Sequence, residues 1–147
     1  MAIVYFDSSA FVKLLIDEEG SDIAAQLWDA ADAVVSSRLA YPEVRAALAA
    51  AARAGRLDPA GEQDAEDGWA EFWEATRAVD LSDRIAESAG TLAKQWALRG
   101  AGAVHLASAL ALGTDKVVLA VWDNRLATGG MAAGLRVVPS TRPLATP

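Results

Sequence analysis

The segment Ile3–Phe6 constrains the fold most, because four consecutive apolar residues end abruptly at a carboxylate, Asp7. An unbroken apolar run of this length is typical of a strand that is buried on both faces of a parallel sheet. Ser8 or Ser9 can cap a helix that we predict from Ala10 onward. Asp7 should therefore lie at the carboxyl end of a central strand, the edge where open α/β sheets bind ligands. The alternative is that Asp7 serves only a local capping turn.

A second predicted buried strand, residues 116–122, also precedes a carboxylate, Asp123, and a short predicted helix. If the two strands are neighbours, Asp7 and Asp123 meet at one sheet edge. Neither aspartate has an obvious cation near it in the sequence, so their approach would favour a bound metal ion. Carboxylate oxygens suit Mg²⁺ or Mn²⁺ rather than zinc. Spacing alone leaves open the alternative that each aspartate is an independent helix cap.

The remaining pattern alternates strands with single helices or helix pairs. Further strands are predicted at residues 33–36, 78–81 and 135–139. Helices are predicted at residues 10–16, 21–28, 38–54, 58–76, 82–98, 101–112 and 124–133. This order predicts an α/β domain with a central parallel sheet of four to five strands and helices on both sides. We assign residues 1–139 to this domain and residues 140–147, which contain Pro143 and Pro147, to a C-terminal tail.

Composition excludes several kinds of site. The chain has no cysteine and one histidine, His105, which excludes thiolate and multi-histidine metal sites. Its formal net charge of −7 argues against non-specific binding to nucleic acid, so any RNA contact should be local or assisted by metal ions. No basic segment precedes the first apolar run, so we expect neither a signal peptide nor a membrane span, and a cytoplasmic location.

Glu43 is a third candidate at the same edge, because it lies early in the helix that follows the strand at 33–36. An alternative role is a favourable interaction with the helix dipole. Among the basic residues, Lys13, Arg38 and Arg45 are local candidates for contacts with RNA phosphates, although a solvated surface position also explains them.

Four segments, in this order, resemble the PIN-domain family and, within it, the VapC-type toxins of bacterial type II toxin–antitoxin pairs. They are FDSSA at 6–10 with KL at 13–14, SS at 36–37 leading into YPEVRAAL at 41–48, LRGAGAVHLASA at 98–109, and WDNRL at 122–126. Each segment is a weak signal alone, but the resemblance covers nearly the whole chain.

The resemblance implies a single PIN-like domain that acts as a metal-dependent ribonuclease. Asp7, Glu43 and Asp123 match the family's acidic positions, which hold Mg²⁺ or Mn²⁺ ions that activate water. Ser9 and Asn124 match supporting positions. The family also implies a homodimer and a VapB-type antitoxin that blocks the acidic site, often with an arginine.

Position 102 departs from the family, which usually has aspartate where this chain has Gly102. Glycine supplies no metal ligand, and inside a helix it costs up to about 1 kcal/mol relative to alanine. We therefore expect a weakened site, whether the change is natural or engineered. Asp115 precedes its strand and should lie at the opposite sheet edge, so it is not a substitute. The alternative function is a PIN-like module that binds antitoxin or RNA without cleavage.

Two other families with carboxylates at strand ends fit less well. A receiver domain needs adjacent acids after the first strand, and a haloacid-dehalogenase phosphatase needs a second aspartate where Ser9 stands. For His105 an RNA contact is the alternative, and we interpret it as a half-buried helix residue. Trp69, Phe72 and Trp73 share one helix face, which indicates either core packing or a groove for a partner.

Overall fold

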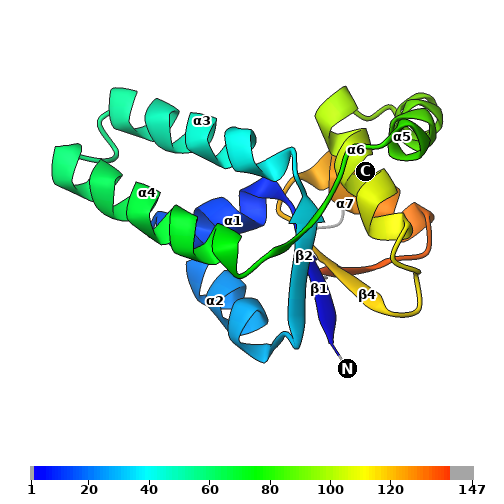
Figure 1. Cartoon of the computed structure of the whole chain (residues 1–147), viewed down its shortest axis with the longest axis horizontal. Coiled ribbons are helices and arrows are strands. Elements are labelled where there is room, and N and C mark those ends of the chain that lie inside the picture. The colour runs from blue at the N-terminus through cyan, green and yellow to red at the C-terminus, as the bar shows by residue number, and fades with distance from the viewer. Residues whose placement is uncertain (1, 140–147) are drawn as a thin grey trace, which may run out of the picture.

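A computed structural model describes residues 2–139, and these form a five-stranded parallel sheet in the order β3-β2-β1-β4-β5 (Figure 1). The strands are β1 (Ile3–Phe6), β2 (Ala33–Ser37), β3 (Arg77–Val79), β4 (Val117–Ala120) and β5 (Arg136–Val138). β1 is the central strand and pairs in parallel with β2 and β4. The predicted parallel sheet, and the adjacency of the two strongest apolar strands, are confirmed. The predicted tail at 140–147 lies outside the described residues.

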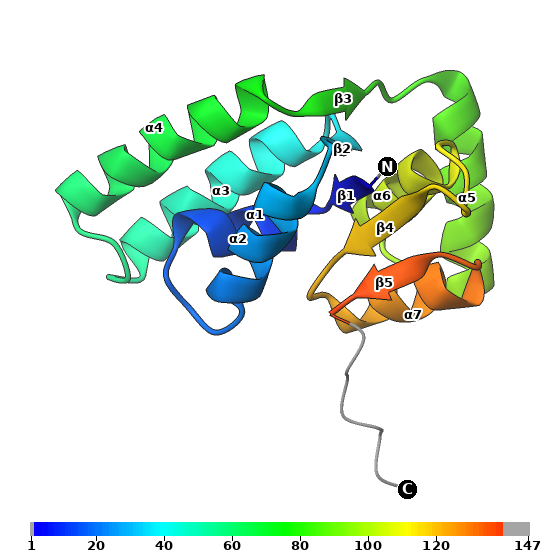
Figure 2. The ribbon, with the colours of Figure 1, turned by 90° about the horizontal axis from the view of Figure 1, so that it is seen from below.

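Seven helices in this part of the chain cover the sheet in two layers. They are α1 (Ser8–Leu15), α2 (Ser21–Ala30), α3 (Ala40–Arg53), α4 (Pro59–Glu74), α5 (Asp83–Trp96), α6 (Gly100–Leu110) and α7 (Asn124–Ala132). The first four pack on one face of the sheet and the last three on the other, while α3 and α4 extend together away from the strands (Figures 1 and 2). None of them is long and apolar enough to span a membrane.

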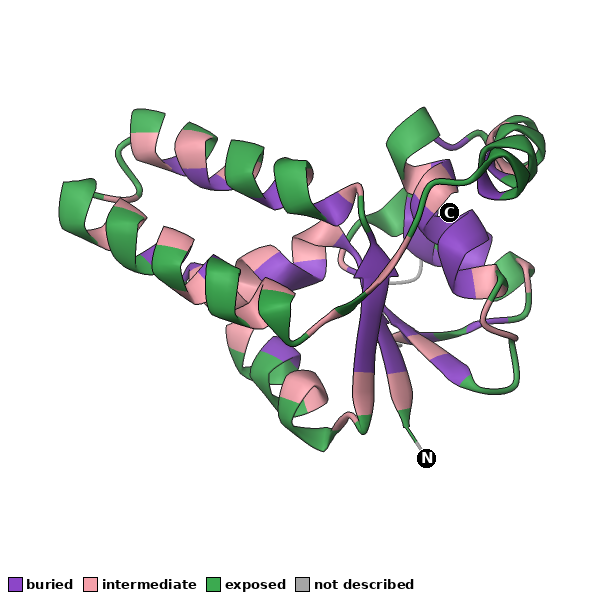
Figure 3. Ribbon diagram, in the orientation of Figure 1, coloured by how far each residue is buried: buried purple, intermediate pink, exposed green. Residues whose placement is uncertain are grey.

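Alternating side chains of β1 divide the core into two clusters, because successive residues of a strand point to opposite faces of the sheet. Val4 and Phe6 belong to the cluster beneath α1–α4, and Tyr5 belongs to the cluster beneath α5–α7. Tyr5 and Phe6 are completely buried, and burial in general concentrates along the sheet and the facing helix surfaces (Figure 3).

The aromatic residues of α4 pack in the core. Trp69 is buried, with its ring centroid 4.9 Å from that of Phe11. Phe72 packs edge-on to Trp28 at 4.8 Å, and Trp73 lies 5.4 Å from Trp69. Of the two interpretations of this aromatic face, the structure therefore favours packing within the domain.

Several predicted boundaries shift by a few residues. The strand predicted at 116–122 ends at Ala120, so Asp123 follows it at a distance of three residues and not directly. The residue that caps α1 is Asp7 itself, and not Ser8 or Ser9. Asp115 precedes β4, at the sheet edge opposite to Asp7, as predicted.

Two helical glycines allow the packing between α7 and the sheet to be tested. A Cβ atom at Gly130 would lie 2.8 Å from Leu119 Cδ2 and 3.3 Å from Val137 Cγ2, and both neighbours are buried. A Cβ atom at Gly90, an exposed residue of α5, would meet nothing within 4 Å. We expect Gly130→Ala to lower the free energy of unfolding by about 1–3 kcal/mol. Gly90→Ala should instead raise it, by up to about 1 kcal/mol. Urea unfolding of both variants tests this, and equal effects would contradict the packing of α7.

Candidate active site

Four helices begin at the carboxyl edge of the sheet, and their first turns surround one open cavity of about 530 Å³. The three predicted acidic residues all line it, Asp7 from the start of α1, Glu43 from α3 and Asp123 from α7. Gly102 and His105 line it from α6. The carboxyl edge of the sheet, as inferred from the sequence, thus places the three predicted acidic residues around one cavity.

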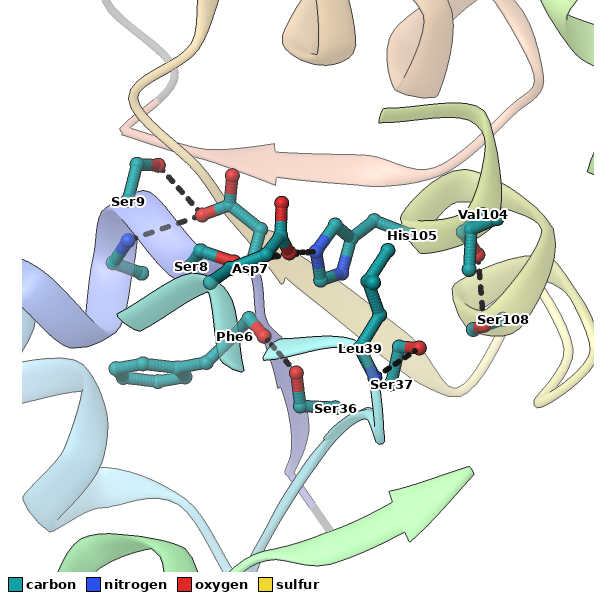
Figure 4. Close-up of polar contacts among 12 residues, drawn as sticks. Phe6, Asp7, Ser8, Ser9, Ser36, Ser37, Leu39, Val104, His105 and Ser108 are labelled. Atoms are coloured by element: carbon teal, nitrogen blue, oxygen red, sulfur yellow. Dashed lines mark hydrogen bonds and ion pairs between the residues drawn. The ribbon is translucent and has the colours of Figure 1, made fainter. Parts of the chain in front are cut away.

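Asp7 is the most buried carboxylate of the cavity, with 5% of its surface exposed. Its Oδ1 accepts hydrogen bonds from the Ser9 hydroxyl at 2.6 Å and from the Ala10 amide at 3.0 Å (Figure 4). The Ser9 oxygen also accepts a bond from the Trp122 amide at 3.1 Å. Asp7 is therefore a helix cap and a cavity residue at once, and Ser9 ties it to the segment after β4.

Burial raises the pKa of Asp7 to about 6, because the ionised carboxylate loses hydration. The nearby His105 ring and the hydrogen bonds from Ser9 and Ala10 oppose this shift, while the negative charge of Asp123 adds to it. The two aspartates therefore repel one another across the cavity, as their position at neighbouring strands implied. Neither forms an ion pair with another described residue.

Glu43 is held by two neighbours. Its Oε1 accepts a hydrogen bond from the Ser8 hydroxyl at 2.6 Å and lies 2.6 Å from His105 Nε2. Burial alone would raise the pKa of Glu43, but the bonds from His105 and Ser8 outweigh it and lower the pKa. Glu43 is therefore ionised at neutral pH, with one oxygen committed to these two partners.

His105 links Glu43 to the core, a role that the sequence did not reveal. The ring is 3% exposed, hence fully and not half buried, and its Nδ1 lies 2.7 Å from the Tyr5 hydroxyl. That hydroxyl accepts a bond from the Ser37 amide at 3.0 Å. In the tautomer with its proton on Nε2, Nε2–H donates to Glu43 and the Tyr5 hydroxyl donates to Nδ1. The one available signal was that His105 lies three residues after Gly102, on the same helix face.

Gly102 leaves an open position in the first turn of α6. A Cβ atom built there would meet nothing within 4 Å. The first turn of α6 contains no acidic residue, and no side chain caps this helix. Asn124, the other predicted supporting residue, is the first residue of α7 and also lines the cavity.

The oxygen donors around the cavity are of the kind that binds hard cations such as Mg²⁺. In their present positions they do not form a complete metal site. Within residues 2–139, no three acidic, histidine or cysteine side chains converge closely enough to hold a metal ion. Asp7 and Asp123 present carboxylates in mutual repulsion, which a divalent cation would relieve. Glu43 is drawn towards His105 and Ser8, and Gly102 contributes no donor.

Comparison with known proteins places the chain among close relatives. Residues 4–127 match the family described as PIN domain. The chain is 61% identical over 140 residues to two relatives from Mycobacterium tuberculosis, ribonuclease VapC45 of strain CDC 1551 / Oshkosh and ribonuclease VapC49 of strain ATCC 25618 / H37Rv. Each alignment covers 95% of this chain and 97% of the relative.

Solved structures share the fold at lower identity. The crystal structure of Mycobacterium tuberculosis VapC20, a sarcin–ricin loop cleaving toxin, matches with a TM-score of 0.66 and 16% identity, covering 90% of this chain and 95% of that one. VapBC2 from Rickettsia felis, bound to a DNA fragment from their promoter, matches with a TM-score of 0.62 and 11% identity, covering 92% and 96%.

The raised pKa of Asp7 predicts that its charge destabilises the fold. The folded carboxyl binds a proton more tightly than the unfolded one, whose pKa is 3.8, so this group's contribution to stability falls as pH rises from about 4 to 6. Asp7→Asn keeps the acceptor for Ser9 and Ala10 without the charge. In EDTA at pH 7 we expect it to raise the free energy of unfolding by about 1–3 kcal/mol, and we expect the gain to disappear near pH 4. Urea unfolding at both pH values measures this free energy.

The exposed control Asp64→Asn should change the free energy of unfolding little. A gain for Asp7→Asn that is independent of pH would contradict the raised pKa of Asp7.

The Tyr5–His105 contact predicts a second stability effect. Tyr5→Phe keeps the ring but leaves the Ser37 amide and His105 Nδ1 without their buried partner. We expect a loss of about 1–3 kcal/mol in unfolding free energy. Tyr41→Phe, which removes a partly exposed hydroxyl, is the matched control and should cost almost nothing. Equal losses in thermal or urea unfolding would argue against the hydrogen-bonded chain.

Proposed function

The chain belongs to the PIN-domain family and, within it, to the VapC-type toxins, and we propose that it is an endoribonuclease toxin of a type II toxin–antitoxin pair. It would hydrolyse RNA phosphodiester bonds in the carboxylate cavity. The observation that carries this proposal is the convergence of Asp7, Glu43 and Asp123 on one cavity at the carboxyl edge of the sheet. The name ribonuclease, which two relatives at 61% identity bear, supports it.

We propose that Asp7 and Asp123 hold a Mg²⁺ or Mn²⁺ ion, with Glu43 as the third acidic group beside them. Their oxygen donors suit these hard cations, and the repulsion between the two aspartates supports binding of positive charge. When bound, such an ion supplies electrophilic stabilisation of the phosphate and raises the acidity of water.

The chain's own residues contribute orientation and charge. Ser9 and the Ala10 amide hold one Asp7 oxygen in place, so the carboxylate keeps a fixed position in the cavity wall. Ser8 and His105 do the same for Glu43, and they keep its pKa low, so that it remains ionised at neutral pH. Fixed groups of this kind need no reorganisation when substrate binds.

We further propose a VapB-type antitoxin as protein partner, a homodimeric assembly and a cytoplasmic location. The VapBC2 pair among the structural neighbours supports an antitoxin partner. The cavity is open to solvent and carries a surplus of carboxylates, so an arginine side chain from a partner would be complementary to it.

A second candidate is a PIN-like module that binds antitoxin or RNA without cleaving. Two observations favour it: Gly102 removes one acidic group from the usual family set, and no three side chains of the described residues lie close enough together to hold a metal ion. The two candidates differ in whether RNA is turned over.

Gly102→Asp distinguishes them, because the position has room for a side chain. We expect the added carboxylate to raise Mg²⁺ or Mn²⁺ affinity roughly tenfold or more, since affinity follows the number of charged ligands. Cleavage of a labelled single-stranded RNA should rise with it. Calorimetric metal titration and a gel assay measure the two effects, with Gly102→Asn as a control of similar shape without charge.

Three outcomes are informative. Greater cleavage by Gly102→Asp than by the unchanged chain supports an attenuated nuclease. Identical cleavage by both means that position 102 is not an acidic site position here. RNA binding without turnover in both proteins favours the non-cleaving module.

A further inference from the structure

The cations named from the sequence as RNA contacts are engaged elsewhere. Lys13 pairs with Glu18 at 3.0 Å, Arg38 with Asp80 at 2.5 Å, and Arg45 with Glu66 at 2.8 Å. None of these three cations lines the carboxylate cavity.

Two arginines do line the cavity, Arg99 at the start of α6 and Arg125 in the first turn of α7. Both residues are exposed, and neither forms an ion pair within residues 2–139 although Asp7, Glu43 and Asp123 line the same cavity. Within the described residues, two arginines without an ion pair thus line the same cavity as the carboxylates, in a chain whose net charge is −7.

Arg125 also lines a second cavity of about 390 Å³. Asn124 and Arg125 belong to both cavities, so the second adjoins the first. Its other side is formed in part by Trp96, a partly exposed indole at the end of α5. Ala97, in the left-handed conformation at φ 52°, ends α5 directly after Trp96, so one short turn carries both Trp96 and Arg99.

We propose that Arg99, Arg125 and Trp96 form a binding site for the single-stranded RNA that flanks the bond to be cut, which rests on the proposed function. The two arginines bind backbone phosphates, for which a guanidinium offers paired donors. Trp96 contacts a base in the adjoining cavity, because an aromatic face stacks on any base.

Electrostatics explains why such a site is needed. A polyanion is repelled by the net negative chain and by the cavity's own carboxylates. Arg99 and Arg125 at the rim of the cavity offset this repulsion locally. The net negative charge of the chain led us to expect such a local contact with RNA. An acidic peptide would also meet the arginines, but it would make no use of an indole beside them, so RNA is the better match.

Binding of a fluorescein-labelled single-stranded RNA hexamer in EDTA, measured by fluorescence anisotropy at several salt concentrations, tests the proposal without requiring catalysis. We expect Arg99→Gln and Arg125→Gln each to weaken binding by roughly three- to tenfold, and to reduce the slope of log affinity against log salt by about 0.7. Arg136→Gln is the matched control, because Arg136 is exposed, lacks an ion pair among the described residues and lines a cavity at the opposite end of β4.

A hexamer that contains 2-aminopurine reports the base contact, since stacking on an indole quenches its fluorescence. Trp96→Leu keeps an apolar side chain against the core beneath α5–α7 and should abolish the quenching, whereas Trp96→Phe should retain part of it. Circular dichroism and thermal unfolding confirm that the variants are folded. A Trp96→Leu variant that quenches like the unchanged chain would remove Trp96 from the site.

The proposal is overturned if the unchanged chain does not bind the hexamer, if the Arg99 and Arg125 variants bind like Arg136→Gln, or if hexaglutamate displaces the RNA as well as unlabelled hexamer does. Failure of the proposed function looks different: RNA binding depends on both arginines, yet neither the unchanged chain nor Gly102→Asp cleaves. Cleavage that is indifferent to Arg99→Gln and Arg125→Gln overturns this inference alone.

Discussion

The burial of the Asp7 carboxylate at the end of the central strand is the constraint on which the rest of the site depends. A carboxylate buried at the end of a central strand loses hydration, and a second negative charge nearby raises its pKa further. The fold tolerates this because Ser9 and the Ala10 amide hold one Asp7 oxygen. The parallel register of β1 and β4 places both aspartates at the same edge of the sheet. The hydrogen bonds that form the sheet therefore also keep the two negative charges near each other.

Glu43 is also a partly buried carboxylate, but the cost of its burial is offset in a different way. Its burial is compensated within the protein, by Ser8 and by a chain that runs through His105 and Tyr5 to the backbone of β2. Asp7 also accepts two hydrogen bonds, from Ser9 and the Ala10 amide, but they do not offset the cost of its burial, and its pKa stays raised. The cavity therefore combines Glu43, whose pKa its partners lower, with Asp7, whose pKa burial raises, so the metal ion that we propose would stabilise the ionised form of Asp7 more than that of Glu43.

The sequence predicted the sheet edge and its acids because each depends on a local pattern. Each pattern spans about ten residues or fewer: one is the apolar strand that ends at Asp7, and the other is the helix start that contains Glu43. The contact between Tyr5 and His105 joins residues 100 positions apart and follows no local period, so only the packed α6 reveals it. Lys13 and Arg45 were indistinguishable from Arg99 and Arg125 in the sequence, because ion pairing depends on neighbours brought together by folding.

The lack of a side chain at Gly102 affects this balance of charges. A fourth carboxylate in the first turn of α6 would face the same cavity as Asp7 and Asp123, and it would raise their repulsion whenever no cation is bound. Glycine avoids that cost and, under the proposed function, would also lower the gain from binding an ion. It also leaves the neighbouring Arg99 without an acidic partner in that turn. Under the proposed function, a chain with glycine here would exchange cation affinity for a cavity rim that is more favourable to phosphate, so metal binding and RNA binding would not need to change together.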